Sequence, residues 1–504
     1  MKKKTFYVTT PIYYPSGDLH IGHVYTTVMA DILCRFKKEQ GYETFFVTGS
    51  DEHGQKIEKK AREASVEPKE YVDKLVVKFK KLWIDMDIDY SKFMRTTDED
   101  HQYTIQKIFT MLYNKGLIYL SKYKGMYCVS CEEFLTQSQI SDGVCPTCKN
   151  IPTITEEETY MLKVSQFKKF LKELISSDFI IPISRRNEMI NSFVDNNLED
   201  LSITRVSFTW GVKTIENPEH IIYVWIDALS NYISALGYLQ KNNKLMNKFW
   251  GDDTEILHIV GKEITRFFTI YWPVILKGCG LRMPTKILSH SWILSKGLKM
   301  SKSIGNVIDP IELLNEFSSD TIRFYVVHNL PYNIDGDITT EAIIESYNLN
   351  LANNFGNLIS RVSNMIIINF GGILNKVDIS NFFIFNTIKK IYEKYVEQMN
   401  EYEIANATKT ALELGNICNK YIEEVQPWIL KKQNKLDELN NFLYELQYGI
   451  IALNIMLRPI LVKSSVIISE QMGVNEDVTI ENIFNQDVTF NKIKEKFIIF
   501  NRIK

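Results

Sequence analysis

The stretch FYVTTPIYYPSGDLHIGHVYTTVMADILCRFK, residues 6–37, decides the fold because it passes from the pattern of a buried strand to that of a helix. The apolar run Phe6-Tyr7-Val8 predicts a β-strand, and residues 24–37 predict a helix. The motif Asp18-Leu19-His20-Ile21-Gly22-His23 lies between them, so we expect it at the N-terminus of the helix. Backbone amides and the helix dipole favour phosphate there, and the two imidazoles add hydrogen-bond donors. Gly22 would let a ligand approach the backbone closely.

A second motif, Lys299-Met300-Ser301-Lys302-Ser303, lies well past the middle of the chain between Gly297 and Gly305. The flanking glycines predict a mobile segment that can close over a triphosphate. Each motif alone is a weak signal, because a surface histidine pair or a solvated lysine loop explains it equally well.

Taken together, in this order and at this separation, the two motifs resemble the ATP-binding signature pair of the class I aminoacyl-tRNA synthetases. The residues around them resemble those of the methionyl-tRNA synthetases, and the resemblance runs from Thr5 almost to the C-terminus. It implies a ligase that converts L-methionine and ATP into methionyl-adenylate and pyrophosphate, and then transfers methionine to the 3′ end of tRNA(Met). His20, His23, Lys299 and Lys302 would be catalytic, stabilising charge on the phosphate oxygens as pyrophosphate leaves.

Length and composition agree with such a protein. The chain has 504 residues, enough for about three domains with a sizeable core. Its formal net charge of -2 excludes a generally basic nucleic-acid coat, so tRNA would be bound by local patches. No run of eighteen apolar residues occurs, and Met1-Lys2-Lys3-Lys4 leads directly into the first predicted strand. We therefore expect no signal or transit peptide, no membrane partner and a cytoplasmic location.

Four of the seven cysteines form two knuckles, Cys128-x-x-Cys131 and Cys145-x-x-Cys148. This spacing predicts one closed tetrahedral Zn²⁺ site with a structural role, since four thiolates leave no open position for chemistry. Two disulfides, four reduced thiols or a knuckle that reads nucleic acid are the alternatives. A reducing compartment disfavours disulfides, and the knuckles lack a nearby basic and aromatic cluster. The remaining cysteines, Cys34, Cys279 and Cys418, lie among apolar residues and are expected in the core.

The pattern along the chain predicts an α/β protein whose Rossmann-like catalytic domain is interrupted by an insert. Strands are expected at residues 6–10, 44–48, 223–226, 256–261 and 286–289. Beyond about residue 337 helical periodicity takes over, which predicts a helix bundle. The expected domains are the first catalytic half (1–115), the zinc-bearing connective insert (116–215), the second catalytic half with the lysine loop (216–337) and the α-helical anticodon-binding domain (338–504).

The resemblance also implies binding residues. Those for ATP, which would enter with Mg²⁺, are Gly22, Gly261, Lys262, Glu263, Lys299, Met300, Ser301, Lys302 and Ser303. Those for methionine are Ile12, Tyr14, Asp51, Trp225, Ala228, Leu229, Tyr232, Ile264 and Phe267. By this carry-over Asp51 holds the α-ammonium, Tyr232 faces the thioether and Glu263 contacts the ribose. Any one of these aromatic residues, taken alone, is better explained as core.

The anticodon-binding residues implied by the resemblance are Asn357, Arg361 and Trp428. Asn357 and Arg361 are four residues apart and share one helical face, and Trp428 offers a flat surface for an unstacked base. The alternative is that Trp428 packs a helix junction, Asn357 caps a turn and Arg361 forms a surface ion pair. Some relatives continue into a C-terminal dimerising barrel, whereas this chain stops at Lys504, so we expect a monomer.

Three residues depart from the family pattern. Phe268 stands where histidine is usual, Glu263 where aspartate is usual, and Ser291 where glycine is usual. Phe268 removes a polar group from the rim of the methionine pocket. Synthetases for isoleucine, valine or leucine would need a much larger editing insert, and a cysteinyl enzyme would have a metal-binding cysteine after the first strand. The alternative from another class is a zinc-ribbon RNA-binding or tRNA-chaperone protein that keeps the fold without activity. The intact His20, His23, Lys299 and Lys302 argue against it.

Overall fold

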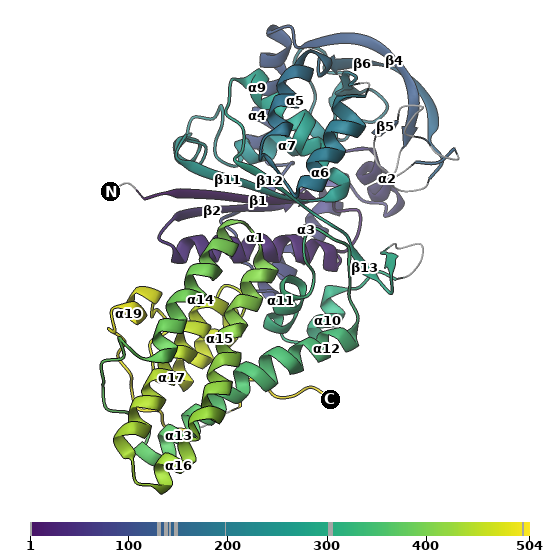
Figure 1. The fold of residues 1–504 in the computed structure, drawn as a ribbon. Coiled ribbons are helices and arrows are strands. Elements are labelled where there is room, and N and C mark those ends of the chain that lie inside the picture. Colours follow the sequence, from purple (N-terminus) through teal and green to yellow (C-terminus); the bar gives the residue numbers. More distant parts are fainter. Residues whose placement is uncertain are drawn as a thin grey trace. The chain divides into compact units, whose positions relative to one another are not determined.

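The computed structural model describes residues 3–128, 133–135, 140, 143–145, 150–196, 198–300, 306–495 and 498–504 (Figure 1). The chain forms two compact units. The first contains Met1–Ala30, Gln40–Ile84 and Ile88–Trp292, and the second contains Asp31–Glu39, Asp85–Asp87 and Ile293–Lys504. The four domains expected from the sequence remain a prediction, since these units group the residues differently.

The first unit is built on a six-stranded parallel sheet with the order β3-β2-β1-β11-β12-β7. Its strands are β1 (Thr5–Tyr13), β2 (Glu43–Ser50), β3 (Lys92–Arg95), β7 (Ile180–Ile181), β11 (Thr254–Gly261) and β12 (Lys286–His290). The central strand β1 is buried along nearly its whole length because both faces of a parallel sheet are covered. Four strands expected from the sequence, now β1, β2, β11 and β12, are confirmed.

Helices cover both faces of this sheet. Figure 1 shows α4, α5, α7 and α9 on one face and α3 with the start of α1 on the other. The helices and helical turns are α1 (Ile21–Glu39), α2 (Gln55–Glu63), α3 (Pro68–Asp85), α4 (Glu99–Asn114), η1 (Ser165–Phe167), α5 (Lys168–Ser176), α6 (Ile183–Met189), η2 (Ile190–Val194), α7 (Val224–Ser234), α8 (Lys244–Phe249), η3 (Lys262–Ile264), η4 (Phe267–Tyr271) and α9 (Trp272–Cys279).

The strand expected at residues 223–226 is wrong, because helix α7 begins at Val224. Tyr-Val-Trp-Ile has the aromatic and β-branched composition of a strand. The buried residues that follow, however, continue at helical spacing as Ile226, Leu229 and Ile233. The edge position of the sheet is taken instead by β7, a strand of two residues that comes from the expected insert and pairs with β12.

The rest of the expected insert carries one antiparallel sheet and one strand, β9, of a second, two-stranded sheet whose other strand, β10, lies beyond residue 215. The larger has the order β5-β4-β6-β8, with long pairing from Ile118 opposite Leu162 to Tyr127 opposite Thr153. The bounds are β4 (Ile118–Cys128), β5 (Glu133–Leu135), β6 (Thr153–Leu162), β8 (Leu201–Ser202), β9 (Thr204–Arg205) and β10 (Ile221–Ile222). The first of the knuckle cysteines thus ends the long strand β4.

The second unit is mainly helical, as expected beyond residue 337. Helices α14, α15 and α17 lie side by side in Figure 1. Its elements are β13 (Ile293–Ser295), β14 (Leu298–Lys299), α10 (Pro310–Glu316), α11 (Ser319–His328), β15 (Gly336–Asp337), α12 (Thr340–Ser346), η5 (Tyr347–Gly356), α13 (Asn357–Phe370), α14 (Phe383–Asn400), α15 (Ile404–Val425), α16 (Pro427–Lys432), α17 (Leu436–Leu457), α18 (Val462–Gln471) and α19 (Ile480–Phe484). No helix in the described part of the chain has the length and apolar character needed to cross a membrane.

A buried arginine joins distant segments of this second unit. Arg323 on α11 is fully buried, and its Nη2 lies 2.6 Å from Oδ2 of Asp31 on α1. The same guanidinium donates to the backbone carbonyls of Met86, Pro459 and Ile460. A buried charge is tolerated only with such partners, so this cluster fixes the second half of α1 within the helical unit.

Candidate functional site

The two motif histidines lie at the start of α1, as the sequence predicts. The His20 backbone N–H donates to Nδ1 of His23 at 3.0 Å, and the Gly22 N–H donates to Nδ1 of His20 at 3.1 Å. The two rings lie 3.9 Å apart between centroids. A Cβ atom at Gly22 would approach Cε1 of His20 to 2.8 Å, so glycine here makes room for the His20 ring.

These backbone bonds determine which ring nitrogens can donate. A ring nitrogen that accepts a hydrogen bond carries no proton, so each neutral imidazole has its proton on Nε2. The hydroxyl of Thr27 donates to the backbone carbonyl of His23 at 2.8 Å and holds the first helical turn together. Both rings are half-buried. In this tautomer the ring donors are the Nε2–H groups, and both rings lie at a helix N-terminus, where an anion binds readily.

The segment Gly261-Lys262-Glu263-Ile264 follows the carboxyl end of β11 and forms the turn η3. The Glu263 carboxylate folds back over Gly261, where an added Cβ would lie 2.8 Å from its Oε2. The Trp292 Nε1–H donates to Oε2 of Glu263 at 2.9 Å, and the Lys262 ammonium lies 3.7 Å from the Trp292 ring centroid. Ligands of open α/β sheets bind at the carboxyl ends of strands, which is where this carboxylate lies.

The residues expected to bind methionine come from β1 and the residue after it, the loop after β2, helix α7 and the turns after β11. The rings of Trp225 and Phe267 stack at 3.6 Å with an angle of 7° between their planes. Tyr232 is buried, and burial raises the pKa of its hydroxyl. The charge of Asp51 raises this pKa further, whereas a backbone hydrogen bond at Ile12 lowers it.

The other expected methionine residues lie in the same unit. Ala228 and Leu229 are buried on α7, Tyr14 is half-buried just after β1, and Ile264 is half-buried in η3. The divergent residue Phe268 is also buried, 5.6 Å from the Tyr232 ring and 5.8 Å from the His258 ring between centroids. The position where the family usually has histidine is therefore an apolar contact within an aromatic cluster.

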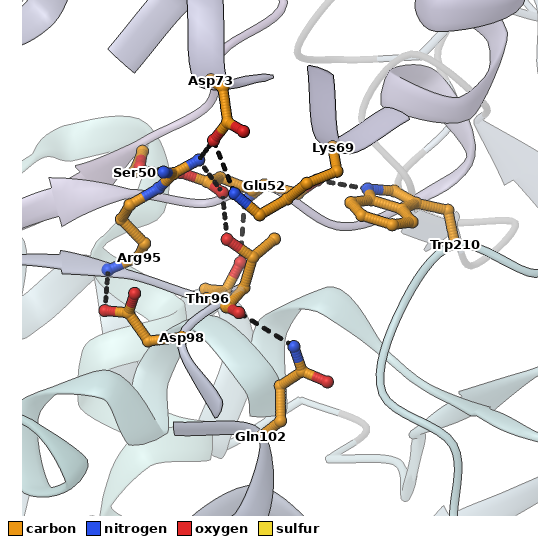
Figure 2. A network of polar contacts seen from close by, with 10 residues as sticks. Ser50, Glu52, Lys69, Asp73, Arg95, Thr96, Asp98, Gln102 and Trp210 are labelled. Carbon is orange, nitrogen blue, oxygen red and sulfur yellow. Dashed lines mark hydrogen bonds and ion pairs between the residues drawn. The ribbon is translucent and has the colours of Figure 1, made fainter. Parts of the chain in front are cut away.

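Asp51 lies on the loop Gly49-Ser50-Asp51-Glu52-His53-Gly54, at the carboxyl end of β2. It is 7% exposed, and its backbone N–H donates to the Tyr13 carbonyl at 3.0 Å. Figure 2 shows how the next residue, Glu52, is held by Arg95, Ser50 and Trp210. A Cβ at Gly49 would come within 2.1 Å of the Met94 carbonyl oxygen, so the loop begins at a position where strands β2 and β3 leave no room for a side chain.

His53 anchors the far end of this loop to α7. Its Nδ1 lies 2.6 Å from Oδ2 of Asp227, and the other oxygen of Asp227 lies 2.7 Å from Nε2 of His101 on α4. The Nδ1 atom of His101 lies 2.7 Å from the Ser234 hydroxyl. Burial opposes ionisation of Asp227, but the charges and hydrogen bonds of the two histidines outweigh it and lower its pKa to about 2. The carboxylate therefore stays ionised while fully buried.

Sequence reasoning missed Glu52, Arg95, His53, Asp227 and His101. Their partners are 43 to 174 residues apart, so no local pattern joins them. The available signal was chemical. Asp227 interrupts a strongly apolar helix, and a charge in such a place needs a partner.

The lysine motif lies only partly within the described residues. Lys299 is exposed in β14 of the second unit, where its carbonyl accepts from the Asn306 side chain at 3.2 Å, and Met300 follows it. Ser301, Lys302 and Ser303 lie outside the described residues.

Two of the four knuckle cysteines, Cys131 and Cys148, also lie outside the described residues. Cys128 and Cys145 are both buried and form a small cluster with Ile140. Among the described residues no group of three or more metal-ligating side chains occurs. Cys34, Cys279 and Cys418 are buried as expected, and burial raises the pKa of Cys279 to about 11.

The expected anticodon residues belong to the helical unit. Asn357 is exposed as the first residue of α13, and Arg361, one turn later, donates to Glu423 on α15 at 2.7 Å. Trp428 is 50% exposed in α16, which starts two residues after α15 ends. Trp428 is thus half covered and half accessible, which fits both the stacking and the packing interpretation, and the Arg361 ion pair agrees with the surface alternative.

Comparisons with known proteins address the chain as a whole. The family model described as tRNA synthetases class I (M) matches residues 6–153 and 147–363. A methionine-tRNA ligase of Caldanaerobacter subterraneus subsp. tengcongensis is 46% identical over 483 residues, covering 95% of this chain and 75% of that protein. One of Ureaplasma parvum serovar 3 is 44% identical over 491 residues, covering 94% and 93%. Among solved structures, Mycobacterium tuberculosis methionyl-tRNA synthetase in complex with methionyl-adenylate has a TM-score of 0.92 at 31% identity, covering 99% of this chain and 100% of that one.

Proposed function

This chain belongs to the methionyl-tRNA synthetases of class I, and from that premise we propose how its residues divide the work. The reaction is that of a methionine-tRNA ligase, in which methionine is activated by ATP and transferred to tRNA. The relatives agree on methionine, so the branched-chain and cysteinyl alternatives, and the inactive RNA-binding protein, are set aside. The identity along nearly the whole chain carries this conclusion.

For the activation step, an oxygen of the methionine carboxylate attacks the α-phosphorus of ATP, and pyrophosphate leaves. Negative charge then grows on the phosphate oxygens. The Nε2–H groups of His20 and His23 are the proposed donors to these oxygens, which the two backbone bonds to Nδ1 support. Lys299 and Lys302 supply cationic groups for the triphosphate. Mg²⁺ enters with ATP and neutralises part of its charge.

For substrate recognition, Asp51 receives the methionine ammonium and Tyr232 faces the thioether. The proximity of Asp51, Tyr232 and Ile12 within one unit supports this assignment. Trp225, Ala228, Leu229 and the other expected residues form the apolar wall, and Met, being flexible, needs such a wall more than it needs hydrogen bonds. Glu263 contacts the ribose, held in place by Gly261 and Trp292.

For the connective insert, a structural zinc bound by Cys128, Cys131, Cys145 and Cys148 is proposed. The donor chemistry fits, because two of these thiols are buried in one small cluster at the end of β4. Four thiolates would hold Zn²⁺ and stabilise the segment that joins the knuckles, with no part in the reaction.

For tRNA, Asn357, Arg361 and Trp428 are proposed to read the anticodon. The half-exposed indole of Trp428 supports this role, since an unstacked base needs an accessible aromatic face.

The test is ATP–pyrophosphate exchange with each of the twenty amino acids, followed by charging of tRNA(Met). Exchange that depends on methionine alone, followed by charging, is the expected result. Exchange with another amino acid, or none with methionine, would overturn the proposal.

A further inference from the structure

Glu52 is a carboxylate with no exposure to solvent, next to the proposed ammonium ligand Asp51. Its Oε1 lies 2.6 Å from Nε of Arg95 and also accepts from the Ser50 hydroxyl. Its Oε2 lies 2.9 Å from Nη2 of Arg95 and 2.6 Å from the Thr97 hydroxyl. Both carboxylate oxygens are therefore saturated, and the Arg95 fork binds them in a bidentate way.

The Glu52 backbone is fixed as firmly as its side chain (Figure 2). Its N–H donates to the Thr96 hydroxyl at 2.9 Å, and its carbonyl accepts the Trp210 Nε1–H at 2.6 Å. Consecutive Cα atoms are about 3.8 Å apart, so a fixed Glu52 backbone restricts where the Asp51 Cα atom can lie. The backbone on the other side of Asp51 is held by Tyr13.

We propose that Arg95, acting through Glu52, is a positioning residue that fixes the Asp51 carboxylate for the methionine ammonium. This inference rests on the proposed function of Asp51. A buried ion pair is often no more stabilising than an apolar pair of the same volume, because removing two charges from water is costly. The bidentate ion pair between Arg95 and Glu52, with both carboxylate oxygens saturated, instead restricts the two side chains to one relative orientation.

The network extends from the loop to α3. Arg95 also contacts Asp73, which accepts from Lys69 at 2.6 Å. The Arg95 backbone N–H donates to Asp98 at 3.2 Å. Arg95 is thus held from several directions, and lysine in its place would keep the charge but lose the planar fork.

The experiment compares two ligands of the same enzyme. L-methionine and 4-(methylsulfanyl)butanoate differ only in the ammonium group, and inhibition of exchange measures binding of the second. Arg95→Lys should weaken the binding of L-methionine by about tenfold, which is the effect of losing one hydrogen bond to a charged group. The binding of 4-(methylsulfanyl)butanoate should change by no more than about twofold. Equal weakening of both ligands, or of neither, would overturn the inference.

Thr97→Val is a milder variant that removes one bond to Glu52 and keeps every charge. Thr97→Val should also weaken the binding of L-methionine more than that of 4-(methylsulfanyl)butanoate, but to a smaller extent. If Arg95→Lys does not fold, this variant alone tests the inference. Arg282→Lys is the matched control, because Arg282 binds backbone carbonyls elsewhere in the same unit, and it should change neither ligand.

Asp51→Asn separates failure of the inference from failure of its premise. If Asp51→Asn weakens the binding of L-methionine alone, while Arg95→Lys affects the binding of both ligands equally or of neither, only the positioning role of Arg95 is wrong. If Asp51→Asn weakens both ligands equally, the ammonium assignment is wrong and the inference falls with it.

Discussion

Replacement of His23 by asparagine or by glutamine separates the roles of its two ring nitrogens. The Nδ1 atom accepts the His20 backbone N–H at 3.0 Å, which leaves the proton on Nε2. The side-chain oxygen of asparagine reaches the place of Nδ1, whereas the amide nitrogen of glutamine reaches the place of Nε2. We expect His23→Asn to keep the bond to the His20 N–H and lose the Nε2 donor, and His23→Gln to keep that donor.

The expected magnitudes follow from the loss of a preorganised donor. Removing one such donor costs about 3 to 4 kcal/mol, or roughly 100- to 1,000-fold in the rate of activation. His23→Asn should show this loss in full. His23→Gln should lose about tenfold or less, since ordering its extra torsion costs on the order of 1 kcal/mol. Because the His20 and His23 rings lie 3.9 Å apart, a double asparagine variant should lose less than the sum of the single losses.

The assay is ATP–pyrophosphate exchange at saturating methionine and ATP, with the melting temperature as the control for folding. His23→Asn should melt close to the unchanged protein, because its bond to His20 persists. If His23→Asn exchanges as fast as His23→Gln, the Nε2 proton does not serve the reaction and the reasoning from the backbone bonds is refuted.

Three further predictions concern other parts of the chain. The pKa of Asp227 falls from its usual 3.8 to about 2, so its ionised form contributes about 2 kcal/mol that is present above pH 4 and lost as the pH falls through 2. Asp227→Asn should therefore lower the free energy of unfolding, measured by urea titration at pH 7, by that amount. An unchanged urea midpoint would contradict this prediction. One equivalent of zinc should copurify and be lost in Cys145→Ser; freshly reduced protein that elemental analysis finds free of zinc would rule the site out. Trp428→Ala should slow tRNA charging by roughly ten- to a hundredfold, since stacking is worth about 1 to 3 kcal/mol per base, while leaving adenylate formation nearly unchanged. An equal loss in both steps would exclude a role in reading the anticodon.

The central strands could be predicted because their signal is local. β1 carries the apolar run Phe6-Tyr7-Val8, and β11 carries Ile256-Leu257 and Ile259-Val260, as expected for strands that are buried on both faces. β7 could not be predicted, because two residues carry no periodicity and only pairing with β12 makes them a strand. The start of α7 was mistaken for a strand because Tyr223 and the first three residues of the helix favour β-structure, and only the spacing of buried residues further along reveals the helix.

The candidate site divides in the same way. Asp51 and Tyr232 are candidates because of their motifs and stay predictions, whereas Glu52 and Asp227 can be recognised only through the partners that the fold brings to them. Both anchors attach to the loop directly after Asp51, Arg95 at Glu52 and Asp227 at His53. A carboxylate that must receive an ammonium in a nearly water-excluded place needs its surroundings oriented before the ligand arrives, since reorientation afterwards would consume binding energy. Buried charges with saturated hydrogen bonds supply that orientation, and apolar contacts, which tolerate small rotations, would not.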